Sequence, residues 1–416
     1  MKKRINNLIG FSEDNWKRKK FKHKNKIINI ATVFSGIGAL EYAAKKLKLR
    51  HRIIFAGDID SYVKKTYFQN YELDQLDWHD DIRLFDASKY RGNVDLLMGG
   101  SPCQSFSVVG KRLGLKDSRG SLINQFIKVV KQCQPKVFIF ENVKGLINHD
   151  NGKTWKTIKN KFKKDGYQNI YPMILNSKDY GIPQSRERVF IVGFKDNRKK
   201  ILIPKPIECN IKMETLLSDS KNDKYFLQAI DDKYYLKNKG IKFVTNAKNI
   251  LKRYTQINGD LALCQKANQQ QNWHGDFIFH KVEKKLSFDE YIFNVKDVED
   301  KYFLSEKVKK YVLAGGTGKY KTGNQTDLNI ARPLLATMAK MHRAGVDNYI
   351  SYKKGTDLKG KIRKLTPEEC FRLMGFRNLK TNGISDTQLY KQAGNSIVVD
   401  VIIAILKEMD ITQYGR

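Results

Sequence analysis

The feature that most constrains the fold is a series of short, continuous apolar runs within residues 27–194. These runs are IINIATVF, RIIFAGDID, VDLLMGG, KVFIFENV and RVFIVGF. After the first run, apolar side chains recur at helical spacing, at Leu40, Ala43, Ala44 and Leu47. A strand that is apolar along its whole length is buried on both faces, as in a parallel sheet covered by helices. The pattern therefore predicts an α/β fold with a mostly parallel, doubly wound sheet.

This rhythm stops after Phe194 and returns near the C-terminus. Residues 197–361 are richer in Lys, Asn, Tyr and Gln, and the glycine-rich sequence LAGGTGKYKTGNQTD within them indicates exposed loops. From Lys364 an amphipathic pattern returns, and residues 396–409 are expected to form a final apolar helix. We expect four parts: a basic arm (1–26), the first part of a main domain (27–196), a separate region (197–361) and a return to the main domain (362–416).

A large excess of positive charge points to an acidic partner. The chain has 78 Lys and Arg residues against 43 Asp and Glu, which gives a formal net charge of +35. Such an excess is typical of proteins that bind nucleic acids, although a lysine-rich surface that reflects genome composition would give the same number. The first 26 residues are basic and lack the apolar stretch of a secretory signal, so we expect a solvated or DNA-facing arm.

Cysteine usage and hydropathy argue against several other classes of protein. The five cysteines are odd in number and form no CxxC pair, which disfavours a disulfide framework and a zinc ribbon. No apolar run reaches the roughly 18 residues that a membrane span needs. We therefore expect a protein of a reducing compartment, without a membrane segment and without a bound metal.

A turn and an acidic residue follow the first two apolar runs. The turn FSGIG, residues 34–38, lies between a predicted strand and a predicted helix, where glycines let the backbone approach a ligand at the helix N-terminus. Asp58 ends the next strand about 20 residues further on, where an acid commonly accepts hydrogen bonds from ribose hydroxyls. Together they favour an adenosine-type cofactor, with a structural tight turn and a surface acid as the alternative.

Reactive side chains adjoin the other three runs. Cys103 follows the third run in GGSPCQSFSVVG, and its place between Pro and Gln at a strand end favours a nucleophile over a small core residue. Glu141 ends the fourth run, where a carboxylate is costly unless it is exposed, paired or acting on a substrate; helix capping is the alternative. Arg186 and Arg188 share one side of an extended chain, which suits a carbonyl oxygen, phosphates or a local salt bridge.

In order and spacing, these residues resemble the DNA cytosine-5 methyltransferases. The resemblance covers nearly all of residues 27–194 and 364–416 and rests on FSGIGA, AGDID, DIRLFD, GGSPCQSFSVVG, KDSRGSL, FENV, NSKDYGIPQSRERVF, RKLTPEECFRLMGF and QAGNSIV. It implies a Rossmann-like, S-adenosylmethionine-dependent methyltransferase domain with a smaller inserted target-recognition domain at 197–361. It also implies sequence-specific methylation of double-stranded DNA, with protection of host DNA from a cognate restriction endonuclease.

The resemblance implies a cofactor site for S-adenosylmethionine, released as S-adenosylhomocysteine, from both ends of the chain. Asp58 would bind the ribose and Asp81 the adenine amino group, while Ile59 stands where many relatives have Trp. The implied cofactor residues are Phe34, Gly36, Gly38, Asp58, Ile59, Asp81, Ile82, Pro102, Asn395 and Ser396.

For a cytosine flipped out of the duplex, the resemblance implies four catalytic residues. Cys103 would add to carbon 6, and Glu141 would neutralise the charge at ring nitrogen 3. Arg188 would hold the carbonyl oxygen at carbon 2, and Arg186 would support the loop that carries the thiolate. The implied DNA-binding residues are Gln104, Ser107, Arg119, Gly316, Thr317, Gly318 and Lys319.

Several further expectations come from the same resemblance. The enzyme would be a monomer in the bacterial cytoplasm, associated with the nucleoid through DNA, and linked in function to a restriction endonuclease that it does not bind. Relatives usually carry Thr-Leu before the RKLTPEEC motif, whereas this chain has Arg332-Pro333-Leu334. Two alternatives remain open: a transfer-RNA cytosine-5 methyltransferase, whose Cys-Phe-Thr signature is absent from the sequence, and an inactive nucleic-acid-binding module.

Overall fold

A seven-stranded sheet organises the part of the chain that the computed structural model describes. Strands β3, β2, β1, β4 and β5 pair with their neighbours in parallel. Strand β8 pairs antiparallel with β5 on one side and with β6 on the other. The strands in spatial order are β3 (Trp78–His79), β2 (His51–Gly57), β1 (Ile28–Val33), β4 (Leu96–Gly99), β5 (Val137–Asn142), β8 (Glu187–Phe194) and β6 (Asn169–Asn176). The described residues are 6–7, 9–101, 122–211, 213–216, 243, 246–252, 254–257, 262–263, 275–280, 304–305 and 361–416.

The five apolar runs form five of these strands, and the predicted doubly wound, mostly parallel α/β fold is confirmed. The sequence did not predict the two-residue strand β3, and it did not predict β6. Pro172 and polar residues interrupt its apolar pattern, and β6 lies at the edge of the sheet, where a strand tolerates proline. Edge position therefore explains why this strand carries a weaker signal than the buried ones.

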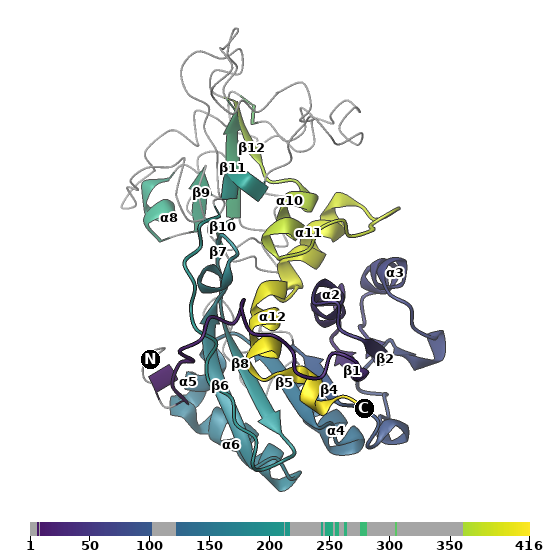
Figure 1. Cartoon of the computed structure of the whole chain (residues 1–416). Helices are drawn as coiled ribbons and strands as arrows, with labels where there is room; N and C mark the ends of the chain where they lie inside the picture. Colours follow the sequence, from purple (N-terminus) through teal and green to yellow (C-terminus); the bar gives the residue numbers. More distant parts are fainter. Residues whose placement is uncertain are drawn as a thin grey trace.

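Helices cover both faces of the sheet (Figure 1). Alternate residues of β1 face opposite layers: Ile28 and Ile30 join one core, and Ala31 and Val33 join the other. The first layer contains α2 (Ala39–Lys46), α10 (Pro367–Leu373), α11 (Asp386–Asn395) and α12 (Val399–Glu408); the second contains α4 (Leu122–Cys133), α5 (Gly145–Asn148) and α6 (Lys153–Lys164). Helix α3 (Ser61–Asn70) packs beside β2 and β3 through Tyr67 and Trp78.

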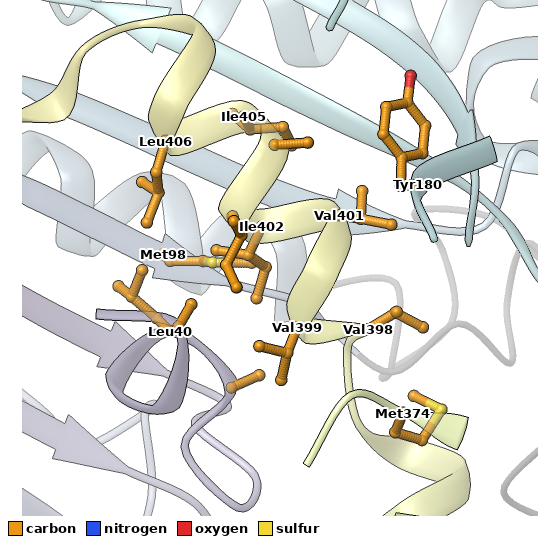
Figure 2. Packing of buried hydrophobic residues seen from close by; sticks show 14 of the residues in the cluster. Leu40, Met98, Tyr180, Met374, Val398, Val399, Val401, Ile402, Ile405 and Leu406 are labelled. Carbon is orange, nitrogen blue, oxygen red and sulfur yellow. The ribbon is translucent and has the colours of Figure 1, made fainter. Parts of the chain in front are cut away.

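Helix α12 joins the C-terminal segment to the first half of the chain. Figure 2 shows Ile402 and Leu406 of α12 beside Leu40 of α2 and Met98 of β4. The stretch Asp386–Glu408 is long and apolar enough to cross a membrane, but 78% of its most apolar window is buried inside the protein. Its apolar character is therefore explained by its place in the core.

The N-terminal arm, which we expected to be solvated or to face DNA, has exposed residues but is anchored to the main domain by a few buried ones. Within the described residues 6–26, Trp16 is only 3% exposed and packs with its ring centroid 6.5 Å from that of Tyr180. Asn6 also exchanges two hydrogen bonds with the backbone of Ile174, at 3.0 and 3.1 Å. Burial of the indole ring and these two bonds hold the arm against the main domain, which outweighs the high charge of the surrounding sequence.

The region between residues 197 and 361 is described in short parts. Its first residues belong to the main core, which continues past residue 197, where we placed a boundary, to Ile201, Ile203, Met213 and Leu216. A second sheet has the order β12-β11-β9, and β10 pairs in parallel with β7. The elements are β7 (Gln184–Ser185), α8 (Ala247–Leu251), β9 (Thr255–Ile257), β10 (Ala262–Leu263), β11 (Gly275–His280) and β12 (Lys361–Lys364).

The packing of α12 predicts a large loss of stability when a buried leucine is truncated. Leu406 is 1% exposed, so Leu406→Ala should lower the free energy of unfolding by about 2–5 kcal/mol, because it removes buried methyl groups and leaves a cavity. Leu84 is 86% exposed, so the matched Leu84→Ala change should stay within about 0.5 kcal/mol of wild type. Urea titration followed by circular dichroism measures both, and equal losses would contradict the assigned core.

Candidate active site

Neighbouring strands of the sheet end at the edge where we placed the site. Because β2, β1, β4 and β5 are adjacent and parallel, their carboxyl ends share one edge. Open α/β sheets bind ligands at this edge. The structure brings three predicted features to it: the turn after β1, Asp58 after β2, and Glu141 in β5.

The turn after β1 has a left-handed backbone conformation. Phe34, Gly36 and Gly38 have φ values of 52°, 53° and 75°, a region that L side chains rarely adopt. At Gly38, a Cβ atom would also overlap the ring of Tyr71, whereas a Cβ atom at Gly36 would meet no described atom within 4 Å. The glycines therefore let the chain turn tightly into α2 and leave space beside Gly36.

Asp58 is hydrogen-bonded to this turn. Its Oδ2 accepts a hydrogen bond from the Gly36 N–H at 3.1 Å, and its Oδ1 accepts one from the Asp60 N–H at 3.1 Å. Burial raises the pKa of Asp58, and these two hydrogen bonds oppose that shift. A carboxylate has about four acceptor positions, so Asp58 has the capacity to accept a further hydrogen bond from a ribose hydroxyl.

Three more predicted residues lie near the ends of β2 and β3. Ile59 is 72% exposed, so an uncovered apolar surface lies next to Asp58, whereas Ile82 is buried. The Arg83 Nε donates to both carboxylate oxygens of Asp81 at 2.9 Å, and these bonds lower the pKa of Asp81. An adenine amino group could therefore bind Asp81 only through the lone pairs that Arg83 leaves open.

The C-terminal segment reaches the same end of the sheet through α11. The Lys391 Nζ lies 2.6 Å from Oδ2 of Asp60, the N-cap residue of α3. Asn395 follows Lys391 by about one helical turn and so shares its face of α11. Asn395 is exposed and Ser396 is buried. The predicted cofactor residues from the two ends of the chain are thereby brought to the same region.

The end of β5 lies against the residues that follow β4. The Asn142 Nδ2 donates to the carbonyl oxygen and to the hydroxyl of Ser101, both at 3.2 Å. A Cβ atom added to Gly100 would lie 2.9 Å from Glu141 Oε2 and 3.5 Å from Ile397 Cδ1. We predicted no role for Asn142 or Ile397 from the sequence. The amide side chain of Asn142, at the end of a buried strand, could have indicated a residue of the site.

Glu141 forms an ion pair in a buried environment. Its side chain is 10% exposed, and its Oε1 lies 3.3 Å from Nε of Arg188. Burial raises the pKa of Glu141, while the positive charges of Arg188 and Arg186 act in the opposite direction. Both arginines are thus close enough to influence Glu141, as their predicted placement on one side of an extended chain implies.

Arg186 binds the C-terminal segment. It is 5% exposed, and its Nη2 donates to the carbonyl oxygens of Gly394 at 3.2 Å and Ser396 at 2.9 Å. This contact links the start of β8 to the residues that surround Asn395. No local pattern in the sequence predicts this contact.

The other predicted site residues lie outside the described residues. They are Pro102, Cys103, Gln104, Ser107, Arg119, Gly316, Thr317, Gly318 and Lys319. Arg332-Pro333-Leu334 lies outside them as well. Among the residues that are described, no group of three or more His, Cys, Asp and Glu side chains is placed to hold a metal ion.

The sheet order, the glycine turn after β1 and the acid after β2 define a Rossmann-like methyltransferase fold. A family model described as C-5 cytosine-specific DNA methylase matches residues 28–410. The chain belongs to this family and is a DNA cytosine-5 methyltransferase of the bacterial restriction–modification type.

Relatives of similar length support this assignment. The orphan methyltransferase M.SPRI of Bacillus phage SPR is 30% identical over 94% of this chain and 99% of its own length. The type II methyltransferase M.HpaII of Haemophilus parainfluenzae is 30% identical over 91% of this chain and 87% of its own length.

Solved structures of low sequence identity share the fold. The methyltransferase EhMeth of Entamoeba histolytica has a TM-score of 0.56 and 18% identity, and covers 94% of this chain and 100% of its own. A putative DNA modification methyltransferase from a prophage of E. coli has a TM-score of 0.53 and 22% identity, and covers 92% of this chain and 98% of its own.

The contact between Gly100 and Glu141 predicts a specific loss of methyl transfer. In Gly100→Ala, the new methyl group would displace Glu141, and we expect kcat to fall by about 10- to 100-fold, as for other small misplacements of active-site groups. In the control Gly92→Ala, the Cβ atom meets no described atom within 4 Å, so only backbone strain at a φ of 72° should result. Incorporation of labelled methyl groups into DNA measures both. Equal activity per folded molecule in the two variants would contradict this geometry.

Proposed function

We propose that this enzyme uses S-adenosylmethionine to methylate carbon 5 of a flipped cytosine within a specific sequence of double-stranded DNA. One observation carries the proposal: Glu141 is paired with Arg188 and lies against Gly100, three residues before Cys103 in the sequence. Cys103 would supply the nucleophile, Glu141 the carboxyl group and Arg188 the guanidinium group for the proposed addition to the cytosine ring.

The residues present at the sheet edge fit the proposed cofactor. Open space beside Gly36 leaves room for a ligand at the N-terminus of α2, and Asp58 has acceptor capacity for ribose hydroxyls. Exposed Ile59 offers an apolar face for adenine in place of an aromatic ring. Phe34, Gly38, Asp81, Ile82, Pro102, Asn395 and Ser396 complete the proposed set. When bound, S-adenosylmethionine supplies an electrophilic methyl group for carbon 5.

Cys103 makes the carbon 5 position reactive. Carbon 5 of cytosine is a poor nucleophile, and addition of the Cys103 thiolate to carbon 6 converts the ring into an enamine. After methylation, a base removes the proton from carbon 5, the bond between sulfur and carbon 6 breaks, and the thiolate leaves by β-elimination. The sequence does not identify this base.

Glu141 stabilises the charge that develops during thiolate addition. The negative charge spreads toward ring nitrogen 3 as the sulfur adds, and a protonated Glu141 would donate to that nitrogen. Burial raises the pKa of Glu141, which favours the protonated form that this role needs. Arg188, on the adjacent strand, would donate to the carbonyl oxygen at carbon 2.

The reaction requires the cytosine to leave the stacked duplex, which costs a few kcal/mol. Basic contacts with phosphates would offset this cost, in keeping with the net charge of +35. We propose that Gln104, Ser107 and Arg119 approach the DNA from one side, and the loop with Gly316, Thr317, Gly318 and Lys319 from the other. The part of residues 197–361 that follows Leu216 would then form the target-recognition domain, and the residues from 27 to 216 would form the catalytic domain with 362–416.

We propose a role in protecting host DNA from a restriction endonuclease, which the name of one of the two relatives supports. M.HpaII is named as a type II methyltransferase, whereas M.SPRI is named as an orphan methyltransferase. We propose a monomer that acts on DNA in the bacterial cytoplasm and does not bind the endonuclease. The alternative of a transfer-RNA substrate is not favoured, because the family model and the named relatives concern DNA methylation and restriction–modification.

The proposed nucleophile predicts complete loss of methyl transfer in Cys103→Ala. Cys209→Ala is the control, because Cys209 is a half-buried thiol that is not among the proposed site residues; its Sγ donates to Ile211 O at 3.4 Å, and its side chain packs against the main core. In the presence of S-adenosylmethionine, wild-type enzyme should also form a denaturation-resistant adduct with duplex DNA synthesised with 5-fluorocytosine in place of cytosine. After methyl transfer, fluorine stands in place of the carbon 5 proton that the elimination step must remove. Electrophoresis detects the adduct. Methylation by Cys103→Ala, or no adduct with wild type, would count against the mechanism.

The proposed acid predicts a change in the pH profile of Glu141→Gln. Since burial raises the pKa of Glu141, its protonated form persists to higher pH than for an exposed glutamate, and wild-type activity should decline as the pH rises through that pKa. Glutamine cannot donate a proton, so kcat should fall by about 10²- to 10⁴-fold, and this alkaline decline should disappear. Single-turnover rates across pH test both effects. A variant with the wild-type profile would exclude Glu141 as the acid.

A further inference from the structure

A chain of buried hydrogen bonds runs beneath the turn after β1 and ends on Glu41. The Gly57 N–H donates to Ser35 Oγ at 2.8 Å, and the hydroxyl oxygens of Ser35 and Thr32 are 2.8 Å apart. The Thr32 Oγ1 lies 2.7 Å from Glu41 Oε1. The Tyr67 hydroxyl donates to the same carboxyl oxygen at 2.9 Å.

With Glu41 as a carboxylate, the number of protons fixes the direction of this chain of hydrogen bonds. Each hydroxyl group has one proton to donate, so once Thr32 donates to Glu41, the 2.8 Å contact between Thr32 and Ser35 is a hydrogen bond only if Ser35 donates. Ser35 in turn accepts from the Gly57 N–H. All bonds then point toward Glu41, and hydrogen bonds aligned in this way polarise and strengthen one another.

Glu41 is an acceptor in a site closed to water. Its side chain is 0% exposed, as is that of Tyr67, and Thr32 and Ser35 are 4% and 8% exposed. The second carboxyl oxygen, Oε2, accepts no hydrogen bond from the described residues, so a proton on it would find no acceptor there. Burial raises the pKa of Glu41, and the bonds from Thr32 and Tyr67 oppose this shift.

This chain of hydrogen bonds joins the strands and helices that border the turn after β1. Gly57 ends β2, Thr32 lies in β1, Glu41 in α2 and Tyr67 in α3. Ser35 belongs to the turn itself, and its N–H also donates to the Gly57 carbonyl at 2.9 Å. Ser35 is therefore hydrogen-bonded to Gly57, at the end of β2, through both its backbone and its side chain. The orientation of the Ser35 hydroxyl group in the second bond depends on Glu41, the final acceptor of the hydrogen-bond chain.

We propose that Glu41 is a positioning residue for cofactor binding: it holds Ser35 against the end of β2 and thereby fixes the neighbouring Phe34 and Gly36. The proposal rests on the function above, because Phe34 and Gly36 belong to the proposed S-adenosylmethionine site. Glu41 itself is fully buried beneath the turn and acts through Thr32 and Ser35. It adds a residue that tunes cofactor affinity without taking part in methyl transfer.

The test is Glu41→Gln with S-adenosylmethionine as the probe. Glutamine keeps the shape of the side chain but is a weaker acceptor and adds N–H donors to a closed site. Titration calorimetry without DNA should show a Kd for S-adenosylmethionine about tenfold higher than that of wild type. At saturating cofactor, kcat should stay close to wild type. Tyr67→Phe removes one of the two bonds to Glu41 and should raise Kd by about two- to fivefold.

Glu408→Gln is the matched control. Glu408 lies in α12, its side chain is 5% exposed, and it pairs with Lys19 at 2.8 Å. Its Oε2, like that of Glu41, accepts no hydrogen bond from the described residues. Glu408→Gln should therefore lower the melting temperature as Glu41→Gln does, with the Kd for S-adenosylmethionine unchanged.

The outcomes separate this inference from the proposed function. If wild type binds S-adenosylmethionine and Glu41→Gln binds it equally well, the positioning role is overturned and the proposed function stands. An equal loss of cofactor affinity in Glu41→Gln and Glu408→Gln would show a general effect of stability and would also overturn it. If Glu41→Gln does not fold, Tyr67→Phe decides by the same comparison. If wild type does not bind S-adenosylmethionine, the proposed function itself fails.

Discussion

The packing of α12 against the sheet is the interaction on which the rest of the structure depends. Ile402 and Leu406 of α12 fill the space between α2 and β4, so the first half of the chain needs the C-terminal segment to complete its core (Figure 2). Because Ser396 and Ile397 directly precede α12, the same packing sets them beside residues of the first half. The placement of Ser396 and Ile397 at the candidate site is therefore a consequence of burying the apolar surface of α12.

Carboxyl groups held out of water are the second constraint on the site. Burial raises the pKa of Asp58, Glu141 and Glu41 alike. An isolated buried carboxylate would be strongly destabilising, and each of these has specific partners: backbone N–H groups, a guanidinium group or hydroxyl groups. Low dielectric surroundings strengthen those contacts, so an arrangement that is unfavourable for folding supplies preorganised polar groups at the sheet edge.

The sequence could predict those features that depend on local pattern. Asp58 and Glu141 each directly follow or end an apolar run, so their place at the sheet edge follows from the run itself. The contacts of Arg186 with Gly394 and Ser396 join residues 208 and 210 positions apart, and no local pattern encodes them. Glu41 gave a signal that we did not use, since it lies next to Leu40 on a helix whose neighbouring side chains are apolar and buried.

The proposed cofactor site and the proposed site for the base meet near the start of β8. Arg186 and Arg188 lie at this point, and each contacts one of the two sites. Arg188 pairs with Glu141, the proposed acid, and Arg186 donates to the backbone on both sides of Asn395, a proposed cofactor residue. Both lie within three residues of one another, between the end of β7 and the start of β8, and a single residue separates them. A displacement of the C-terminal segment would thus be transmitted through Arg186 to the strand that carries Arg188. The geometry of Glu141, the proposed acid, therefore depends on the docking of the segment that is proposed to close the cofactor site.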